Sequence, residues 1–404
     1  MFRSGSSGLA RSAALALGLA LAAALTLDAQ DSKPREPTRP KLDAGRDTNS
    51  SESYYRHGLQ NLPGRPQQAA DAFYWATRLD PSDAQAWYGR WVALLLTRQQ
   101  RDLWVILRDE GLTSREAAQI DSLRYEALLR EPLLYTSLEA MLVRDLFRTL
   151  WIATHGEISE LDIRSIPDPV FRAWYAYGTG RFNESVQQYA VAIERQPKAR
   201  GLHAARARAL VLALAGEDSA IAEFEAERRL AQTAESALVR VYNSREMLEY
   251  SIGRVWEMHQ QPEDAREAYG RALVENLAFY PAHTALARLA LAADDTATAL
   301  KEYDLAVQLA PHRADMRYTY GVLLLARQRF DAADEQFRLA VEADSFYVRP
   351  YYLLGFIREG QGKDSLATAY YTSFIARAPT SLAPQMEDAR KRLDRLKRLV
   401  SESH

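Results

Sequence analysis

Small and aromatic residues recur every 34 positions through the C-terminal half of the chain. Four columns share this period, and their members are Gly253, Ala287, Gly321 and Gly355; Ala265, Ala299, Ala333 and Ala367; Tyr269, Tyr303, Phe337 and Tyr371; and Ala272, Ala306 and Ala340, with Phe374 in the fourth place. The last three columns stand at offsets of 0, +4 and +7, which share one face of an α-helix. The first column lies in a preceding helix. The period therefore predicts one helix-turn-helix unit for every 34 residues.

The residue types in these columns have a physical role in helix packing. Small side chains let a neighbouring helix approach to about 8–10 Å, and the aromatic ring between them fills the space that they leave. Proline follows the small column by twelve residues in several units and ends the second helix, because it lacks a backbone donor and disfavours helix at the preceding residue. These prolines are Pro81, Pro197, Pro311 and Pro379.

These columns resemble the tetratricopeptide repeat family. The resemblance covers four successive units over about 245–379 and single units at about 53–81 and 166–197. A degenerate unit is expected at 200–230, with Gly216 at its turn and Phe224 as its aromatic residue. The resemblance implies an all-α fold, an α-solenoid in which stacked helix-turn-helix repeats form a right-handed superhelix. It also implies that the protein binds peptides or partner proteins on a concave face.

The predicted organisation follows from where the columns start and stop. We expect a signal peptide or N-terminal anchor (1–29), a disordered linker (30–52), an N-terminal repeat-like unit (53–97), a helical region without the repeat pattern (98–165), partly degenerate repeats (166–240), four repeats (241–379) and a C-terminal capping helix (380–404). The region 98–165 is either a set of diverged repeats or an inserted helical module. The last helix, rich in arginine and lysine, is either a cap for the end of the solenoid or a helix that lies on a membrane surface.

The N-terminus bears on location. Arg3 and Arg11 precede an apolar run from Ala13 to Leu27, which is too short to span a bilayer comfortably and ends near a small-residue cleavage site after Ala29. This pattern predicts export to the periplasm or the extracellular space. An uncleaved segment that anchors the protein to the membrane is the alternative.

Composition and motifs exclude several classes of chemistry. The chain has no cysteine, so it forms neither disulfides nor thiolate metal sites, and its net charge of −2 argues against nucleic-acid binding. No two histidines have the spacing of a helical zinc site, and no nucleophile-elbow motif occurs. The glycines at Gly178, Gly180, Gly360 and Gly362 fit turns between helices better than phosphate-binding loops. We therefore expect no catalytic residue, no cofactor and no metal.

The first helices supply the candidate partner-binding residues. The resemblance implies that positions −3, +1 and +4, counted from the small residue of the first helix, point into the concave surface. The candidates are Tyr250, Arg254, Glu257, Arg288, Tyr318, Val322, Tyr352 and Phe356; Thr284, Leu291, Leu325 and Glu359 complete the columns. Tyrosine and arginine often anchor protein interfaces. The alternative is that these rings pack between helices or on the cap.

Three functional hypotheses follow. The first is a non-enzymatic scaffold that binds a protein or peptide outside the cytoplasm. The second is a structural subunit of an envelope-associated assembly, tethered by its N-terminal helix. The third, an enzyme, requires a pocket formed by the region 98–165, where His155 is the one obvious catalytic candidate.

Overall fold

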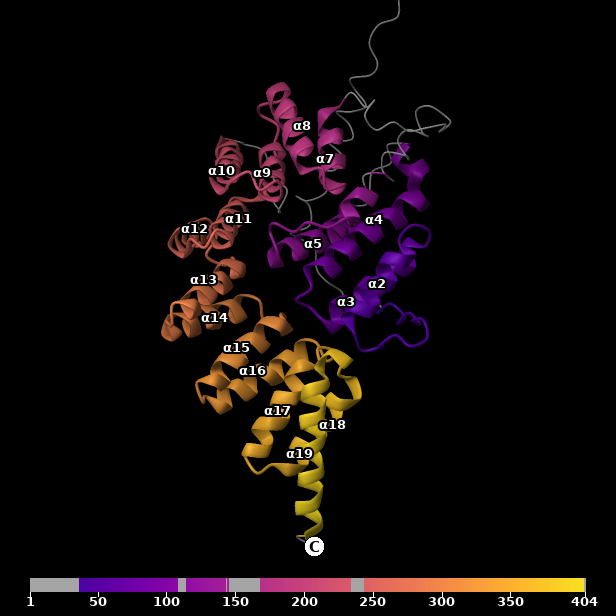
Figure 1. Ribbon diagram of the computed structural model, residues 1–404, viewed down its shortest axis with the longest axis vertical. Coiled ribbons are helices and arrows are strands. Elements are labelled where there is room, and N and C mark those ends of the chain that lie inside the picture. The colour runs from indigo at the N-terminus through magenta and orange to yellow at the C-terminus, as the bar shows by residue number, and fades with distance from the viewer. Residues whose placement is uncertain (1–35, 108–113, 143, 145–167, 234–242, 403–404) are drawn as a thin grey trace, which may run out of the picture. The chain divides into compact units, whose positions relative to one another are not determined.

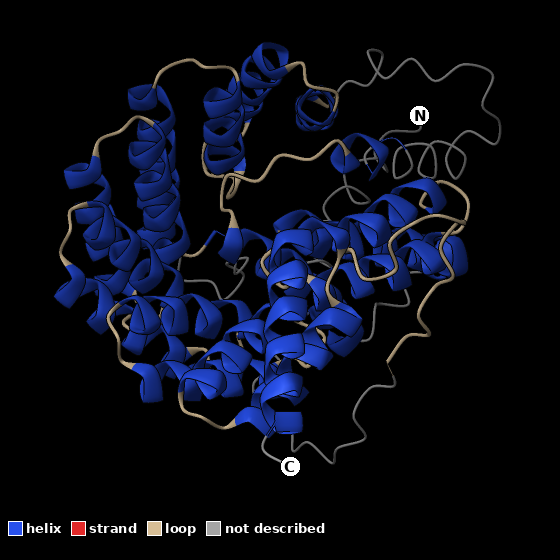
Figure 2. Ribbon diagram, turned by 60° about the horizontal axis from the view of Figure 1, so that its bottom comes forward, coloured by secondary structure: helices blue, strands red, loops and turns tan. Residues whose placement is uncertain are grey.

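The computed structural model describes residues 36–107, 114–142, 144, 168–233 and 243–402. The predicted signal peptide and the first part of the linker lie outside this range, as does His155. All regular structure in the described residues is helical, as Figure 2 shows. None of the helices in these ranges combines the length and the apolar character that a bilayer-spanning segment requires.

The chain divides into two compact units. Unit 1 comprises Met1–Glu36, Leu62–Ala70 and Trp87–Asn276, and unit 2 comprises Pro37–Asn61, Asp71–Ala86 and Leu277–His404. Unit 1 contains most of α4 (Ala84–Leu107), α5 (Ser114–Arg130), α7 (Pro169–Gly178), α8 (Phe182–Arg195), α9 (Leu202–Leu212), α10 (Glu217–Thr233), α11 (Arg245–Met258) and α12 (Pro262–Glu275). Unit 2 contains α2 (Ser51–Asn61), most of α3 (Pro66–Leu79), α13 (Tyr280–Ala292), α14 (Thr296–Leu309), α15 (Ala314–Ala326), α16 (Phe330–Ala343), α17 (Arg349–Gly360), α18 (Asp364–Arg377), η3 (Thr380–Leu382) and α19 (Ala383–Glu402).

Within each unit the helices pack in consecutive pairs. The pairs in unit 1 are α7 with α8, α9 with α10, and α11 with α12, and each second helix also packs on the next first helix. Unit 2 continues in the same manner with α13 and α14, α15 and α16, and α17 and α18, followed by α19 against α18 (Figure 1). The predicted all-α fold of stacked helix-turn-helix repeats is confirmed.

The small columns face the aromatic column at very close range. A Cβ atom added to Gly253 would lie 2.3 Å from the Tyr269 ring, and one added to Gly355 would lie 2.7 Å from the Tyr371 ring. Ala299 and Ala306, on either side of Tyr303, are fully buried. Helix pairs therefore pack at the separation that only glycine or alanine permits.

The turns between paired helices follow the same period. Gln260, Asp294, Gln328 and Gly362 all adopt a left-handed backbone conformation, with φ between 58° and 68°. Among the predicted turn glycines, Gly180 has a φ of 76° and lies in the turn between α7 and α8. Helices α8, α14 and α18 end two residues before their prolines, as expected.

A left-handed turn of the same kind occurs in the α9–α10 pair of unit 1. Leu214 takes the left-handed turn position of the α9–α10 pair, and a second left-handed residue, Gly216, lengthens that turn. The buried aromatic of this pair, Phe224, is therefore displaced by one position from the strict register. This extra residue explains why the sequence pattern looks degenerate here.

In unit 2 the N-terminal segment packs on the C-terminal repeats. The Trp75 ring meets the Phe346 ring edge-on, with centroids 4.9 Å apart. Asp47 Oδ2 accepts hydrogen bonds from the backbone N–H of Thr380 at 2.6 Å and from its hydroxyl at 3.0 Å. The pairing of α2 with α3 uses the repeat geometry too, because a Cβ on Gly58 would lie 2.7 Å from the Phe73 ring.

Candidate partner-binding surface

The +1 column of unit 2 forms a row of exposed side chains on three successive first helices. Arg288 on α13, Val322 on α15 and Phe356 on α17 follow the buried small residues Ala287, Gly321 and Gly355. Val322 and Phe356 each retain 38% of their surface. We call these three residues the unit 2 row. Two large apolar side chains at equivalent positions make this surface suited to contact with another chain.

The tyrosines of the −3 column pack against the aromatic rings of the second helices. Tyr318 lies 5.9 Å from the Phe337 ring, and Tyr352 lies 6.1 Å from the Tyr371 ring. Tyr250 makes the same contact with Tyr269 and is almost fully buried. These rings therefore belong largely to the packing between paired helices, which was the alternative that the sequence left open.

Glu359 in the +4 column accepts hydrogen bonds from three residues on two other helices, α18 and α19. Its carboxylate accepts hydrogen bonds from the Tyr371 hydroxyl at 2.8 Å, from Arg392 at 2.9 Å and from Arg395. Burial raises the pKa of Glu359, but the hydrogen bonds from Arg392, Tyr371 and Arg395 outweigh it and hold the pKa below its usual value. Glu359 thus joins α17 to α19 through its ionised form.

Helix α19 contacts the row at the last repeat. The Arg392 guanidinium lies 5.1 Å from the centre of the Phe356 ring, and the Tyr352 hydroxyl donates to Asp388 at 2.7 Å. Leu393 and Leu396 of α19 are buried in the cluster formed with α17 and α18. The chain's own last helix therefore occupies part of the surface predicted to bind a partner.

The +1 and +4 columns of unit 1 contact another part of the chain. Arg254 donates from Nη1 to Glu257 and from Nη2 to Glu131, both at 3.0 Å. Glu257 also accepts from the Tyr269 hydroxyl. The predicted candidates Arg254 and Glu257 thus lie together, but Arg254 is already paired with a residue that directly follows α5.

Two further residues of the +1 column were not identified from the sequence. Counting from the left-handed turn residues places Trp174 on α7 and Arg208 on α9 in this column. Trp174 hydrogen-bonds to Glu139, and Arg208 Nε donates to the carbonyl oxygen of Pro132 at 3.3 Å. The 34-residue separation of these two residues was a signal that could have revealed them.

Glu139 lies at the centre of a buried polar cluster in unit 1. It accepts a hydrogen bond from the Tyr88 hydroxyl at 2.6 Å. Burial raises the pKa of Glu139, and the nearby Arg124 and Arg208 oppose that shift. Tyr88 and Tyr177 beside it have pKa values well above the usual tyrosine value, chiefly because they are buried.

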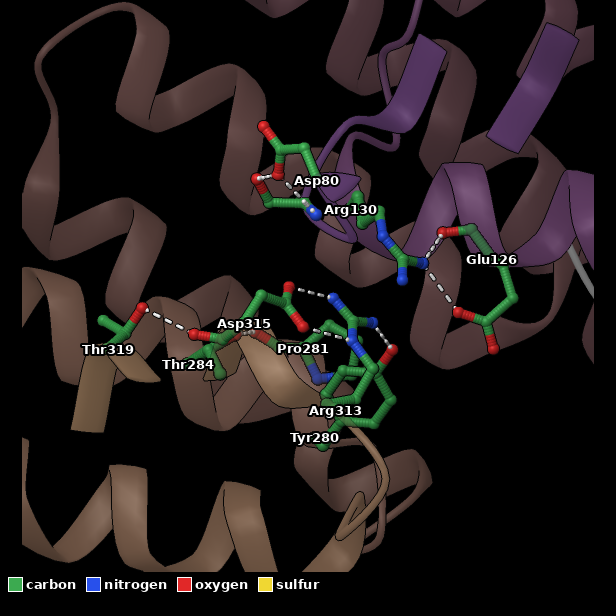
Figure 3. A network of polar contacts seen from close by, with 10 residues as sticks. Asp80, Glu126, Arg130, Tyr280, Pro281, Thr284, Arg313, Asp315 and Thr319 are labelled. Atoms are coloured by element: carbon green, nitrogen blue, oxygen red, sulfur yellow. Dashed lines mark hydrogen bonds and ion pairs between the residues drawn. The ribbon is translucent and has the colours of Figure 1, made fainter. Parts of the chain in front are cut away.

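The polar network in Figure 3 fixes the start of α15. Arg313 donates to both carboxylate oxygens of Asp315, at 2.9 and 2.6 Å, and to the Tyr280 hydroxyl. The backbone carbonyl of Asp315 accepts from Thr319 at 3.0 Å. Arg313 is almost wholly buried, so this network orients the first helix that carries Val322.

The histidines of the first helices link them to their second helices. His203 Nδ1 lies 2.6 Å from Glu223, and His283 Nδ1 lies 2.7 Å from Glu302. Each pair connects a first helix to its own second helix. Over the described ranges no group of three or more acidic, histidine or cysteine side chains has a metal-binding arrangement.

Comparison with known proteins gives the following. No family model matches the chain. A curated relative, an uncharacterized protein of Haemophilus influenzae, is 29% identical over 86 residues, which are 21% of this chain and 48% of the relative. The chain thus spans about half the length of the curated relative it matches.

Several solved structures are similar in fold. YrrB, described as a TPR protein with an unusual peptide-binding site, is 17% identical with a TM-score of 0.38, over 51% of this chain and 99% of that chain. PilF of Pseudomonas aeruginosa is 14% identical with a TM-score of 0.41, over 55% and 95%. The APC/C hetero-tetramer Cut9–Hcn1 is 13% identical with a TM-score of 0.37, over 86% and 76%.

The chain is built of repeated helix-turn-helix units, as the resemblance to tetratricopeptide repeats led us to expect. The periodic small residues and the helix pairs stacked within each unit support this assignment from the chain itself. The unit 2 row lies on the first helices of three successive repeats, and Trp174, Arg208 and Arg254 lie on the first helices of three repeats in unit 1.

Proposed function

We propose that this protein is a non-enzymatic scaffold that binds a protein or peptide partner along the unit 2 row. The observation that supports this most directly is the exposure of Val322 and Phe356 at equivalent positions of consecutive repeats. Residues around them are fixed by buried packing and by the Arg313 network, so the row is presented on rigid helices. A rigid surface binds at a lower entropic cost than one that must order.

The chemistry of the row fits a peptide with both apolar and acidic character. Val322 and the partly buried Leu291 and Leu325 supply apolar contact area. Arg288 adds a cation at the start of the row. Binding at such a surface depends on a few well-placed anchors.

Site-specific photo-crosslinking tests the proposal. A photoreactive amino acid placed at Val322 in the full chain is expected to form adducts with a defined partner. The same amino acid at Leu309, an equally exposed aliphatic position on a second helix, is the matched control. Equal labelling at both positions, or none at Val322, would count against the unit 2 row as the binding surface.

We further propose that the protein acts outside the cytoplasm. The support is the charged start and apolar run of the N-terminal sequence. Mass spectrometry of the native protein tests this, because a chain that begins at Gln30 fits an exported scaffold. An intact N-terminus would favour the alternative, a membrane-tethered structural subunit of an envelope-associated assembly.

A further inference from the structure

A short segment of unit 1, residues 131–139, contacts the first helices of three repeats in turn. It begins with a turn in which the Leu134 N–H donates to the Glu131 carbonyl at 3.1 Å, and residues 134–136 have no regular structure. We call it the resident segment. Its polar contacts run from Arg254 on α11 through Arg208 on α9 to Trp174 on α7. The segment therefore follows the +1 column in the reverse order of the repeats.

Apolar anchors reinforce these polar contacts. Leu133 is buried in a cluster with Leu248, Ile252 and alanines of α9. The Tyr135 ring packs edge-on against Tyr177 at 5.6 Å and against Phe182 at 5.1 Å. The resident segment is thus held as a bound peptide would be, with charged, backbone and apolar contacts at separate positions.

The unit 2 row occupies the same +1 column on α13, α15 and α17, the first helices of three repeats in unit 2. There the chain's own element is a helix, α19, whose Arg392 and Arg395 meet the carboxylate of Glu359. In unit 1 the charges are reversed, because Arg254 meets the carboxylate of Glu131. The two surfaces therefore hold the chain's own elements through ion pairs of opposite polarity.

We infer that the first-helix surface of unit 1 recognises a non-helical peptide in which a carboxylate precedes proline and apolar side chains, and that the resident segment is its built-in occupant. An external peptide of this chemistry binds by displacing it. This inference extends the proposed function from unit 2 to unit 1 and depends on first helices being the binding surface. A tethered occupant competes at an effective concentration in the millimolar range, so the wild-type protein binds such a peptide weakly.

A labelled peptide that copies residues 130–141 of this chain is the probe. Its binding to the full chain is measured by fluorescence anisotropy in wild type and in Leu133→Ser, which removes a buried anchor of the occupant and substitutes no helix residue. We expect at least tenfold tighter binding to Leu133→Ser. Leu134→Ser, the same change at a neighbouring residue that is only partly buried, is the matched control and is expected to resemble wild type.

A mutant cycle locates the bound peptide. In the Leu133→Ser background, Arg254→Gln is expected to weaken binding of the peptide by about tenfold. It should have little effect on a peptide that carries Glu131→Gln, because that peptide lacks the charge that Arg254 pairs with. Equal loss for both peptides would overturn the assignment of this contact.

Hydrogen exchange in the wild-type protein covers the case in which Leu133→Ser fails to fold. Saturating peptide, mass-tagged to distinguish it, should accelerate exchange of the resident segment and leave α15 unchanged. No acceleration, or no gain in binding by a folded Leu133→Ser, would refute the inference. If the peptide fails these tests but Val322 still forms crosslinks, the inference about unit 1 is refuted and the proposed function is retained. If the peptide binds but Val322 forms no crosslinks, only the role of the unit 2 row is refuted.

Discussion

Arg78 and Asp344 form a two-point salt bridge although 266 residues separate them in the chain. Arg78 Nε lies 2.7 Å from Asp344 Oδ2, and Nη2 lies 3.1 Å from Oδ1. Both side chains are mostly buried, and the Arg78 guanidinium also stacks on the Phe346 ring at 4.9 Å. This contact joins the first helix pair of unit 2 to the loop that follows α16.

Removing the charge from Asp344 is expected to loosen that junction. Asp344→Asn keeps an oxygen that can accept from the Phe346 N–H but loses the ion pair. We expect the local opening free energy of α2 and α3 to fall by about 1–2 kcal/mol, which corresponds to roughly tenfold faster amide hydrogen exchange. The control is Asp331→Asn, at an exposed acidic residue of α16. If both variants exchange alike, the salt bridge does not stabilise the junction.

The sequence predicted the helix pairs well because their contacts are local. Gly253 and Tyr269 lie within one repeat, so the spacing of residue types along the chain encodes their contact directly. The Arg78–Asp344 pair is different. It involves one of 51 basic and one of 53 acidic residues, and nothing in the periodic pattern singles out two charges that meet across many repeats.

At the candidate site, too, the sequence predicted the periodic positions but not the contacts with elements outside the repeats. Counting along the first helices grouped Val322 and Phe356 as equivalent positions, and both side chains are partly exposed. The same counting did not indicate that Tyr250 would be buried. The Tyr250 ring packs against the Tyr269 ring on the second helix of the same repeat. The contacts of Phe356 with Arg392 and of Arg254 with Glu131 depend on elements outside the periodic pattern.

The glycine column should tolerate no added methyl group at Gly253. Gly253→Ala would place a Cβ 2.3 Å from the Tyr269 ring, so the helices must separate or the ring must move. We expect a loss of about 1–3 kcal/mol in stability, measured by denaturant unfolding followed by circular dichroism.

Gly270, in the middle of α12, provides the control. No atom lies within 4 Å of a Cβ built there, and alanine favours helix over glycine. Gly270→Ala should therefore raise stability by about 0.5–1 kcal/mol. A result in which both glycine variants are stabilised would show that Gly253 is not a packing constraint.

Ser185 takes the small position of α8, and its size should matter more than its hydroxyl. The side chain is fully buried, and its Oγ donates to the Ala173 carbonyl at 2.8 Å. That carbonyl is already inside a helix, and alanine takes the same position in other repeats. Ser185→Ala should therefore change stability by less than about 1 kcal/mol, whereas Ser185→Leu should cost about 3 kcal/mol by overpacking. Thermal unfolding of the two variants side by side distinguishes a limit on volume from a need for the hydrogen bond.

Docking of α19 should weaken in acid. In the folded protein, burial raises the pKa of Glu359, but hydrogen bonds from Arg392, Tyr371 and Arg395 outweigh it and lower the pKa. Burial is also the largest single influence on the pKa of Asp388, but hydrogen bonds from Arg392 and Tyr352 and the charge of Lys391 together outweigh it and lower the pKa. A carboxylate with a lowered folded-state pKa contributes stability that is complete above its unfolded pKa and is lost as the pH falls through the folded value. Docking should therefore be full above about pH 4.5 and decline below it.

The chain has no cysteine, so Lys397→Cys on the exposed side of α19 gives a single site for a fluorescent dye. Dye anisotropy is expected to fall between about pH 4.5 and pH 3, over the range in which circular dichroism shows the helices intact. Glu359→Gln should have low anisotropy already at pH 7 and no transition. Glu387→Gln is the matched control, because Glu387 pairs with Lys391 of the same helix and its loss should leave the transition in place. If wild type and Glu359→Gln trace the same curve, Glu359 does not hold α19 against the last repeat.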